Sequence, residues 1–336
     1  MLIRRDRLLA AGEKVLIGVS AGPDSVALLY LLAALAPWIE LAGLTGIYVD
    51  HGLRPVEVPE EKALVTAACG RLGVDCLCDA IDVTRHAAAR KISIEHAARE
   101  LRYALFAETA RRLGADRIAV AHTADDQAEE VLLRLLRGSG RAGLSGMRTI
   151  RGGVLIRPLL TTPKAALLAY LADRKIPFLL DSSNLSRDHL RNRIRLDLLP
   201  VLRQYNPNID GTLRRTATLL QDEEELLATL AASSWQKVVS AQPRQGEAPE
   251  LVIDCPAFLV LDRAMQRRVV EMAFLAMASR PDFHKIEAVL RLAAYGEGGA
   301  QLHFSQGLRL KKIRKRLIFS FPAGRVARRG NLDEGF

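Results

Sequence analysis

A polar turn follows the first long apolar run of the chain and carries residue types that are suited to binding phosphate. Its residues are Ser20, Ala21, Gly22, Pro23, Asp24 and Ser25. The apolar segments 14–19 and 26–32 flank it and predict a strand and a helix. A turn at the start of a helix presents backbone N–H groups and hydroxyls to an anion. We therefore predict a nucleotide-phosphate site, although an ordinary capped helix would begin with the same residue types.

Asp24 distinguishes this turn from the common nucleotide-binding loop. The chain has no Gly-x-x-x-x-Gly-Lys-Ser/Thr sequence, so the turn itself supplies no phosphate-binding lysine. A carboxylate beside phosphate groups is repelled unless a cation lies between them. We therefore expect Asp24 to hold Mg²⁺ beside the nucleotide.

A second cluster of reactive side chains spans residues 122–130. If a helix begins near Thr123, then Asp126, Glu129 and Glu130 stack along one flank, with His122 at the preceding strand end. Such a cluster can hold a divalent metal or the ammonium group of a substrate. Acidic residues in a first helical turn also complement the helix dipole with no further role, so both interpretations stay open.

Three further residues are candidates for the same site. Asp50 and His51 follow the second predicted strand and can line a nucleotide site, although an ordinary surface turn is the simpler interpretation. Arg102 lies on a predicted helix, from which it can reach a phosphate or a leaving pyrophosphate.

Two basic segments are candidate contacts for nucleic acid. Arg187, Arg191 and Arg195 recur every four residues on a predicted helix, opposite an apolar stripe. Residues 301–330 contain nine Lys and Arg and no Asp or Glu, in a chain whose net charge is +10. This charge favours a polyanionic partner. The residues assigned to the second surface are Lys311, Lys312, Arg314, Lys315 and Arg316.

The elements that must position these residues alternate between strand and helix in the first half of the chain. Strand candidates at 15–19, 44–49, 76–81 and 117–121 are separated by helical patterns at 26–36, 60–72, 95–113 and 124–136. This alternation predicts an α/β fold with a parallel sheet covered by helices on both faces. The polar loops are then expected to converge beyond the carboxyl ends of the strands. The glycine-rich residues 138–153 predict a flexible loop.

A change of pattern predicts a domain boundary near residue 210. We expect one domain over residues 1–210, and over residues 211–336 a smaller, mainly helical domain that ends in a short β-hairpin. No apolar run reaches the roughly 18 residues that a membrane helix requires, so we expect no membrane segment. The four cysteines include no Cys-x-x-Cys pair and are interpreted as reduced thiols of a cytoplasmic protein.

In their order along the chain, these motifs resemble those of one family. The turn resembles the Ser-Gly-Gly-x-Asp-Ser hallmark of the N-type ATP pyrophosphatases, or PP-loop enzymes, and the full set is similar to the tRNA(Ile)-lysidine synthetases. The segments that carry the resemblance are Ser20–Ser25, Val49–Arg54, Glu95–Tyr103, Ala121–Glu129, Leu135–Gly140, Arg157–Leu160 and Asp181–Pro200. The resemblance implies a PP-loop catalytic domain before residue 210 and a tRNA-binding domain after it.

The family reaction is implied by the same resemblance. ATP adenylates the carbon-2 oxygen of the wobble cytidine in a CAU-anticodon tRNA(Ile), and pyrophosphate is released. The side-chain amine of free L-lysine then attacks carbon 2, so that AMP leaves and lysidine remains. The turn would bind ATP together with Asp50 and His51, and the two basic segments would contact the tRNA.

The resemblance also assigns roles within the site. Asp24 would hold Mg²⁺, and Asp126 and Glu129 would hold the ammonium groups of lysine or a metal. His122 would orient the site or assist proton transfer. Arg102 would neutralise charge in the transition state, with help from the basic helix.

Two residues depart from the family pattern. Ala21 stands where glycine is usual, and its Cβ restricts φ, while Glu130 stands where threonine is common. The chain also resembles a shorter form of the family. The alternatives are a PP-loop tRNA thiolase, another base-adenylating tRNA-modifying enzyme, or a catalytically silent RNA-binding protein. The oligomeric state stays open, and a homodimer is one possibility.

Overall fold

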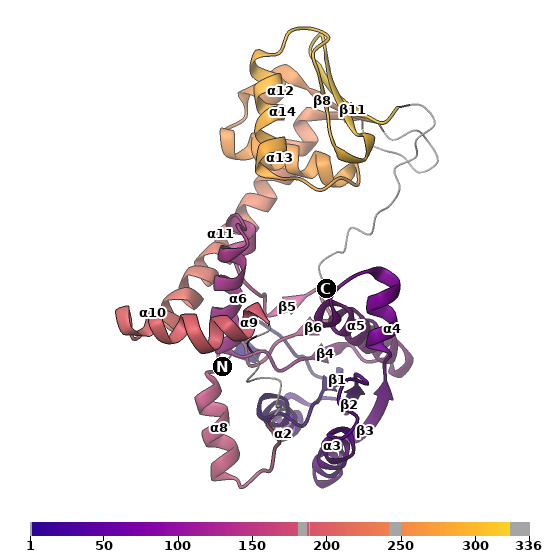
Figure 1. Ribbon diagram of the computed structural model, residues 1–336, viewed down its shortest axis with the longest axis vertical. Coiled ribbons are helices and arrows are strands. Elements are labelled where there is room, and N and C mark those ends of the chain that lie inside the picture. Colours follow the sequence, from indigo (N-terminus) through magenta and orange to yellow (C-terminus); the bar gives the residue numbers. More distant parts are fainter. Residues whose placement is uncertain (1, 181–186, 188, 242–249, 323–336) are drawn as a thin grey trace. The chain divides into compact units, whose positions relative to one another are not determined.

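The computed structural model describes residues 2–180, 187, 189–241 and 250–322, and it divides into two compact units (Figure 1). The first unit spans Met1–Gln221 and the second spans Asp222–Gly335. The division lies within the long helix α11 (Ile209–Val238), whereas the sequence pattern places the boundary near residue 210, where that helix begins. Among the described residues, no helix has the length and apolar composition of a membrane-spanning segment.

The first unit is built on a six-stranded sheet with the order β3-β2-β1-β4-β6-β5. Neighbouring strands are parallel except for the antiparallel pair β5 and β6. Because β1 lies between β2 and β4, the chain order reverses there, and polar loops open at the carboxyl ends of the strands. This confirms the predicted parallel sheet. The strands are β1 (Lys14–Gly18), β2 (Gly43–Asp50), β3 (Asp75–Ala80), β4 (Arg117–Ala119), β5 (Ile150–Arg151) and β6 (Leu155–Ile156).

Helices cover both faces of this sheet, as the strand–helix alternation predicts (Figure 1). Side chains alternate between the faces of a strand, so Ile17 packs in one core with α2, α3 and α8, and Leu16 packs in another with α5. The helices of the first unit are α1 (Leu2–Arg5), α2 (Pro23–Ile39), α3 (Val58–Leu72), α4 (Val83–Arg90), α5 (Ile94–Leu113), α6 (Ala124–Leu136), α7 (Arg141–Leu144), α8 (Lys164–Asp173), α9 (Leu190–Arg193) and α10 (Leu199–Tyr205).

Gly18 allows α5 to lie close against the central strand. A Cβ atom at this position would be 2.7 Å from Cζ of Phe106, which is nearer than real Cβ contacts come. Phe106 itself is buried in the core beneath α5. The absence of a side chain at Gly18 therefore sets the distance between α5 and the sheet.

The prediction of a flexible loop over residues 138–153 is wrong in part, because α7 and β5 lie within it. Side chains of α6 hold this segment by its backbone. Gln127 donates to Met147 O at 3.0 Å and accepts from Met147 N at 2.8 Å. Arg134 donates to Gly143 O at 2.8 Å and to Gly146 O at 3.1 Å. These bonds satisfy backbone groups that a free loop would leave to water.

The second unit packs three helices against one face of a five-stranded antiparallel sheet, with the order β7-β8-β11-β10-β9. The predicted hairpin is the pair β10 and β11. The sequence did not predict the other three strands. Two of them, β7 and β9, have three residues each, and β8 has five. The elements are β7 (Val239–Ala241), β8 (Glu250–Asp254), α12 (Cys255–Val260), α13 (Arg263–Ala276), α14 (Phe283–Tyr295), β9 (Gln301–His303), β10 (Arg309–Ile313) and β11 (Arg316–Ser320).

Candidate active site

The turn at 20–25 connects β1 to α2 and is shaped by its own serines. Ser25 Oγ donates to Ser20 O at 2.6 Å, and Ser20 N donates to Ser25 Oγ at 3.0 Å. Gly22 N donates to Ser20 Oγ at 3.3 Å. Ala21 is buried, and its backbone does not adopt a positive φ, so the Cβ that departs from the family pattern is accommodated without strain.

The start of α2 offers backbone N–H groups to a ligand. Its N-cap residue is Gly22, and no side-chain cap from the described residues closes the first turn. Pro23 occupies the first helical position and has no N–H to satisfy. The following N–H groups lack intrahelical partners, and they lie at the positive end of the helix dipole. This arrangement suits the phosphate groups of a nucleotide.

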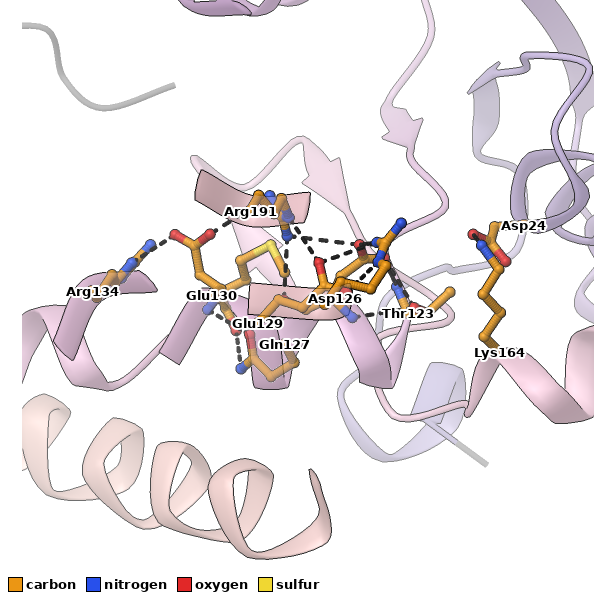
Figure 2. A network of polar contacts seen from close by, with 11 residues as sticks. Asp24, Thr123, Asp126, Gln127, Glu129, Glu130, Arg134, Lys164 and Arg191 are labelled. Atoms are coloured by element: carbon orange, nitrogen blue, oxygen red, sulfur yellow. Dashed lines mark hydrogen bonds and ion pairs between the residues drawn. The ribbon is translucent and has the colours of Figure 1, made fainter. Parts of the chain in front are cut away.

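Asp24 lies beside this helix start and is paired with a lysine that the sequence analysis did not identify. Lys164 Nζ lies 3.1 Å from Asp24 Oδ2, although the two residues are 140 positions apart (Figure 2). Burial raises the pKa of Asp24, and the Lys164 charge acts against that rise. Asp24 Oδ1 is buried without a hydrogen-bond partner in the described part of the chain. This unpartnered oxygen is consistent with the expectation that Asp24 binds a cation.

The acidic cluster lies on α6, which begins at Ala124 as predicted. Thr123 Oγ1 accepts from Asp126 N at 3.3 Å, and Asp126 Oδ2 accepts from Thr123 N at 2.8 Å, which together form a capping box. One oxygen of Asp126 is therefore used in fixing the start of the helix. Burial by itself raises the pKa of Asp126. The Arg191 charge and the Thr123 hydrogen bonds lower the pKa by more than burial raises it, so the net shift is downward.

Glu129 is the most buried member of the cluster and is held by two arginines. Its side chain is 1% exposed, and it accepts from Arg191 Nε at 3.0 Å and from Arg195 Nε at 2.6 Å. Glu130 accepts from Arg134 Nε at 2.7 Å and lies 3.7 Å from Arg191 (Figure 2). The described residues contain no group of three or more His, Cys, Asp or Glu placed to hold a metal ion. The cluster is therefore neutralised by arginine.

A widened helical turn presents these arginines to α6. The predicted basic helix is present from Leu190 onward, so Arg187 lies outside it, and a π-helical turn at Ile194–Leu198 separates α9 from α10. Ile194 and Leu199 pack against Leu132 and Leu133 of α6, which anchors the segment. Such π-turns occur frequently at functional sites. Arg187, by contrast, lies at the surface, 67% exposed and 3.0 Å from Asp197.

His122 and Arg157 follow two neighbouring strands, β4 and β6, which pair through Ala119 and Ile156. Burial lowers the pKa of His122 to about 3, so the imidazole is neutral at pH 7. The charged groups that act on it are Asp126, Arg157, Arg99 and Arg191. Within the described ranges, His122 Nδ1 and Arg157 Nε are buried and have no hydrogen-bond partner. Arg157 is 3% exposed, and no sequence argument singled it out for a role.

Asp50 and His51 lie at the end of the strand next to the turn, and Arg102 lies on the helix that packs against the other face of the sheet from α2. Arg102 is on α5, and burial lowers the pKa of its guanidinium beside Arg99. Asp50 ends β2 and accepts from Gly52 N at 2.8 Å, which shapes the turn that contains His51. Because β2 runs parallel to β1, this turn opens at the same sheet edge as Ser20.

The second basic segment lies on the β10–β11 hairpin of the second unit. Lys311 is exposed and stands opposite Ile318, whereas Lys312 stands opposite Leu317 and donates to Ala293 O at 2.8 Å. Arg314 and Lys315 form the connecting turn, and Arg316 begins β11. Residues from 323 onward lie outside the described residues.

The parallel sheet, its chain reversal at β1 and the turn before α2 define a nucleotide-binding enzyme of the PP-loop class. The PP-loop domain family matches residues 3–202. A solved structure, the U34-tRNA thiolase NcsA from Methanococcus maripaludis with its 4Fe-4S cluster, is similar with a TM-score of 0.54 and 19% identity. The likeness covers 66% of this chain and 76% of that chain, and at this identity it shows the fold alone.

Curated relatives narrow the class further. A tRNA(Ile)-lysidine synthase from Geobacillus kaustophilus is 33% identical over 328 residues, which cover 96% of this chain and 69% of that protein. The Bacillus subtilis synthase is 31% identical and covers 95% and 68%. The Clostridium acetobutylicum synthase is 33% identical, and the match covers 80% of this chain but only 58% of that protein. The chain belongs to the tRNA(Ile)-lysidine synthase family.

Proposed function

We propose that the protein attaches L-lysine to carbon 2 of the wobble cytidine in CAU-anticodon tRNA(Ile) and consumes ATP in doing so. The observation that carries the proposal is the match to lysidine synthases through both units, at 33% identity over 96% of the chain. The PP-loop domain accounts for the use of ATP. A thiolase stays an alternative, and it is supported by a likeness of fold only. As a tRNA-modifying enzyme, the protein would act in the cytoplasm.

The reaction has two chemical steps. In the first, the carbon-2 oxygen of cytosine attacks the α-phosphorus of ATP, and the bond to the bridging oxygen breaks, so that pyrophosphate leaves. In the second, the lysine side-chain amine attacks carbon 2 and loses a proton, and the bond from carbon 2 to oxygen breaks to release AMP. The enzyme must therefore bind a polyanion, neutralise a leaving group and position an amine.

The phosphate groups are assigned to the open start of α2. The uncapped N–H groups after Gly22 would bind them, with Asp50 and His51 at the neighbouring strand end. The buried Asp24 Oδ1 oxygen suits a hard cation. Bound there, Mg²⁺ would neutralise charge on the phosphate oxygens. Arg102 is assigned to the charge that develops on the leaving pyrophosphate.

His122 is assigned to orienting the reactants. A pKa near 3 makes its imidazole a weak proton acceptor at pH 7, so it is poorly suited to remove a proton from the amine. A neutral imidazole can donate one hydrogen bond and accept another. We therefore favour orientation over proton transfer.

Asp126 and Glu129 are assigned to the ammonium groups of lysine, and their partners suggest how lysine binds. In the structure, Arg191 and Arg195 both donate hydrogen bonds to Glu129. An ammonium group gains a carboxylate partner only if these arginines move away. Phosphate groups of ATP or tRNA would attract both guanidinium groups. We propose that phosphate binding thereby frees the carboxylates for lysine.

The tRNA is assigned to the basic helix and to the hairpin of the second unit, through Arg187, Arg191 and Arg195 and through residues 311–316. Lys311, Arg314, Lys315 and Arg316 carry exposed charge in the hairpin. Lys312 is assigned a smaller share, because its ammonium already donates to Ala293 O. We keep a homodimer as a hypothesis that light scattering can test.

A label-transfer assay tests the proposal. Purified protein is incubated with ATP, Mg²⁺, labelled lysine and CAU-anticodon tRNA(Ile), and the expected products are lysine-labelled tRNA and one AMP per label. The matched control is the same tRNA with uridine at the wobble position, which should accept no label. Folded protein that binds both ATP and tRNA but transfers no lysine would contradict the proposal.

A further inference from the structure

We propose that Lys164 is a phosphate-binding cation of this site, supplied from α8 because the turn at 20–25 has no lysine of its own. In the structure, the Lys164 ammonium donates to Asp24 Oδ2, within the turn at 20–25. The inference rests on the ATP-dependent reaction proposed above, and Lys164 lies outside the segments that carry the family resemblance.

The backbone of Lys164 is fixed against the acidic helix. Lys164 N donates to Asp125 Oδ2 at 2.7 Å, and Ala124 N donates to Thr162 O at 3.0 Å. The first turn of α8 is thereby tied to the first turn of α6. Leu167 of α8 also shares the core that α2 forms against the sheet. The base of the lysine side chain is therefore held in place beside the start of α2, while its flexible stem leaves the ammonium free to move.

A purely structural role explains the Lys164–Asp24 pair poorly. Its side chains are 32% and 23% exposed, so the pair is half-buried and keeps some contact with water. Ion pairs with this access to water contribute little to stability. Figure 2 shows the Lys164 side chain extending from α8 toward Asp24, away from the arginine-filled acidic cluster. The ammonium is thus placed where the phosphate groups are expected.

Nucleotide binding would exchange the partners of both residues. A triphosphate carries more negative charge than the single carboxylate of Asp24, so it can compete with Asp24 for the Lys164 ammonium. Asp24 would then be left for a cation that accompanies the nucleotide. The effect is that a lysine distant in sequence replaces the lysine that the common nucleotide-binding loop carries within itself.

Nucleotide affinity tests the inference without tRNA or lysine. Calorimetry would measure ATP binding to the full chain in EDTA and then in Mg²⁺. In EDTA, Lys164→Met is expected to weaken ATP binding by about tenfold to a hundredfold, which corresponds to the loss of one charged hydrogen bond. Lys164→Arg should recover most of that affinity. Lys175→Met removes an exposed charge just beyond the same helix and should leave ATP binding unchanged.

Asp24→Asn separates a binding role from a structural one. If Lys164 binds phosphate, Asp24→Asn should leave ATP affinity in EDTA unchanged or tighter, because a competing carboxylate is gone. If the pair only ties α8 to α2, both variants should lower the melting temperature alike while ATP affinity stays at the wild-type value, and the inference would be overturned.

Two further outcomes distinguish the inference from the proposed function. If Lys164→Met is poorly folded, Lys164→Gln serves as the second neutral variant with the same expected loss of ATP affinity. Wild-type protein that binds no ATP would overturn the proposed function. Equal ATP affinity in wild-type protein and a folded neutral variant would overturn this inference alone.

Discussion

Replacing Glu129 by glutamine should destabilise the first unit strongly, because it leaves two arginines facing a neutral group. Removing one partner of a buried ion pair costs about 3–5 kcal/mol. The Glu129 side chain is 1% exposed, but Arg191 and Arg195 are 24% and 30% exposed and keep some contact with water. We therefore expect the free energy of unfolding to fall by about 3 kcal/mol, at the lower end of that range.

Calorimetry is the suitable assay because the chain has two units that need not unfold together. For a unit of this size, each kcal/mol shifts the midpoint by about 2–4 °C, so Glu129→Gln should lower one midpoint by about 6–12 °C. The shift should persist at high salt, because buried charges are screened little. A double variant with Arg195→Gln should recover part of the loss, since it removes one of the stranded charges.

Glu130→Gln is the matched control for this prediction. Glu130 is the next residue on α6, and its main partner is Arg134, one helical turn away at 2.7 Å. A pair of this kind contributes about 0.5 kcal/mol. If Glu129→Gln and Glu130→Gln lower the midpoint by the same amount, the two-arginine arrangement does not carry the stability that we assign to it.

Three further predictions concern other parts of the chain. Stability should fall as pH decreases from about 6.5 toward 3, because His122 binds a proton when unfolded but stays neutral when folded, with a pKa of about 3. Urea unfolding at pH 7 and pH 5 should show a smaller difference for His122→Asn, and an unchanged difference would refute the assignment. Gly146→Ala should lower the free energy of unfolding by about 1–3 kcal/mol, because φ at residue 146 is +69° and the new Cβ would lie 2.7 Å from Nε2 of Gln127. Gly152→Ala has a positive φ of +55° but open space, so it should cost less, and equal losses in denaturant titrations would count against the contact. Lys311→Gln should reduce the salt dependence of tRNA affinity by up to about one unit of slope, and Lys312→Gln by less. If neither variant changes the slope from its wild-type value, the hairpin does not contact the tRNA.

The parts of the fold that depend on residues close together in the sequence could be predicted from it. The order of β1, the polar turn and α2 follows from an apolar segment, a polar segment and a helical segment that succeed one another without a gap. The start of α6 follows from Thr123 and Asp126, which satisfy each other within one turn. The strands β5, β6, β7 and β9 have two or three residues each, which is too short for a period of two to appear.

The pairing of charges in the site could not be predicted in the same way. Arg191 and Arg195 lie 62 and 66 positions from Glu129, so their basic pattern in the sequence indicates only a surface for phosphate. Lys164 lies 140 positions from Asp24 and belongs to no recognised motif. Charge patterns indicate which side chains need partners, but only the packing of α6 against the arginine helix and of α8 against α2 decides which partners they meet.

Because Gly18 has no side chain, it leaves room between β1 and α5. The ring of Phe106 fills that space and seats α5 on the sheet, and the same helix carries Arg99 and Arg102. A methyl group at residue 18 would lie 2.7 Å from Cζ of Phe106, so the ring or the helix that carries it would have to shift. The placement of those two charges therefore depends on a glycine in the strand beneath their helix.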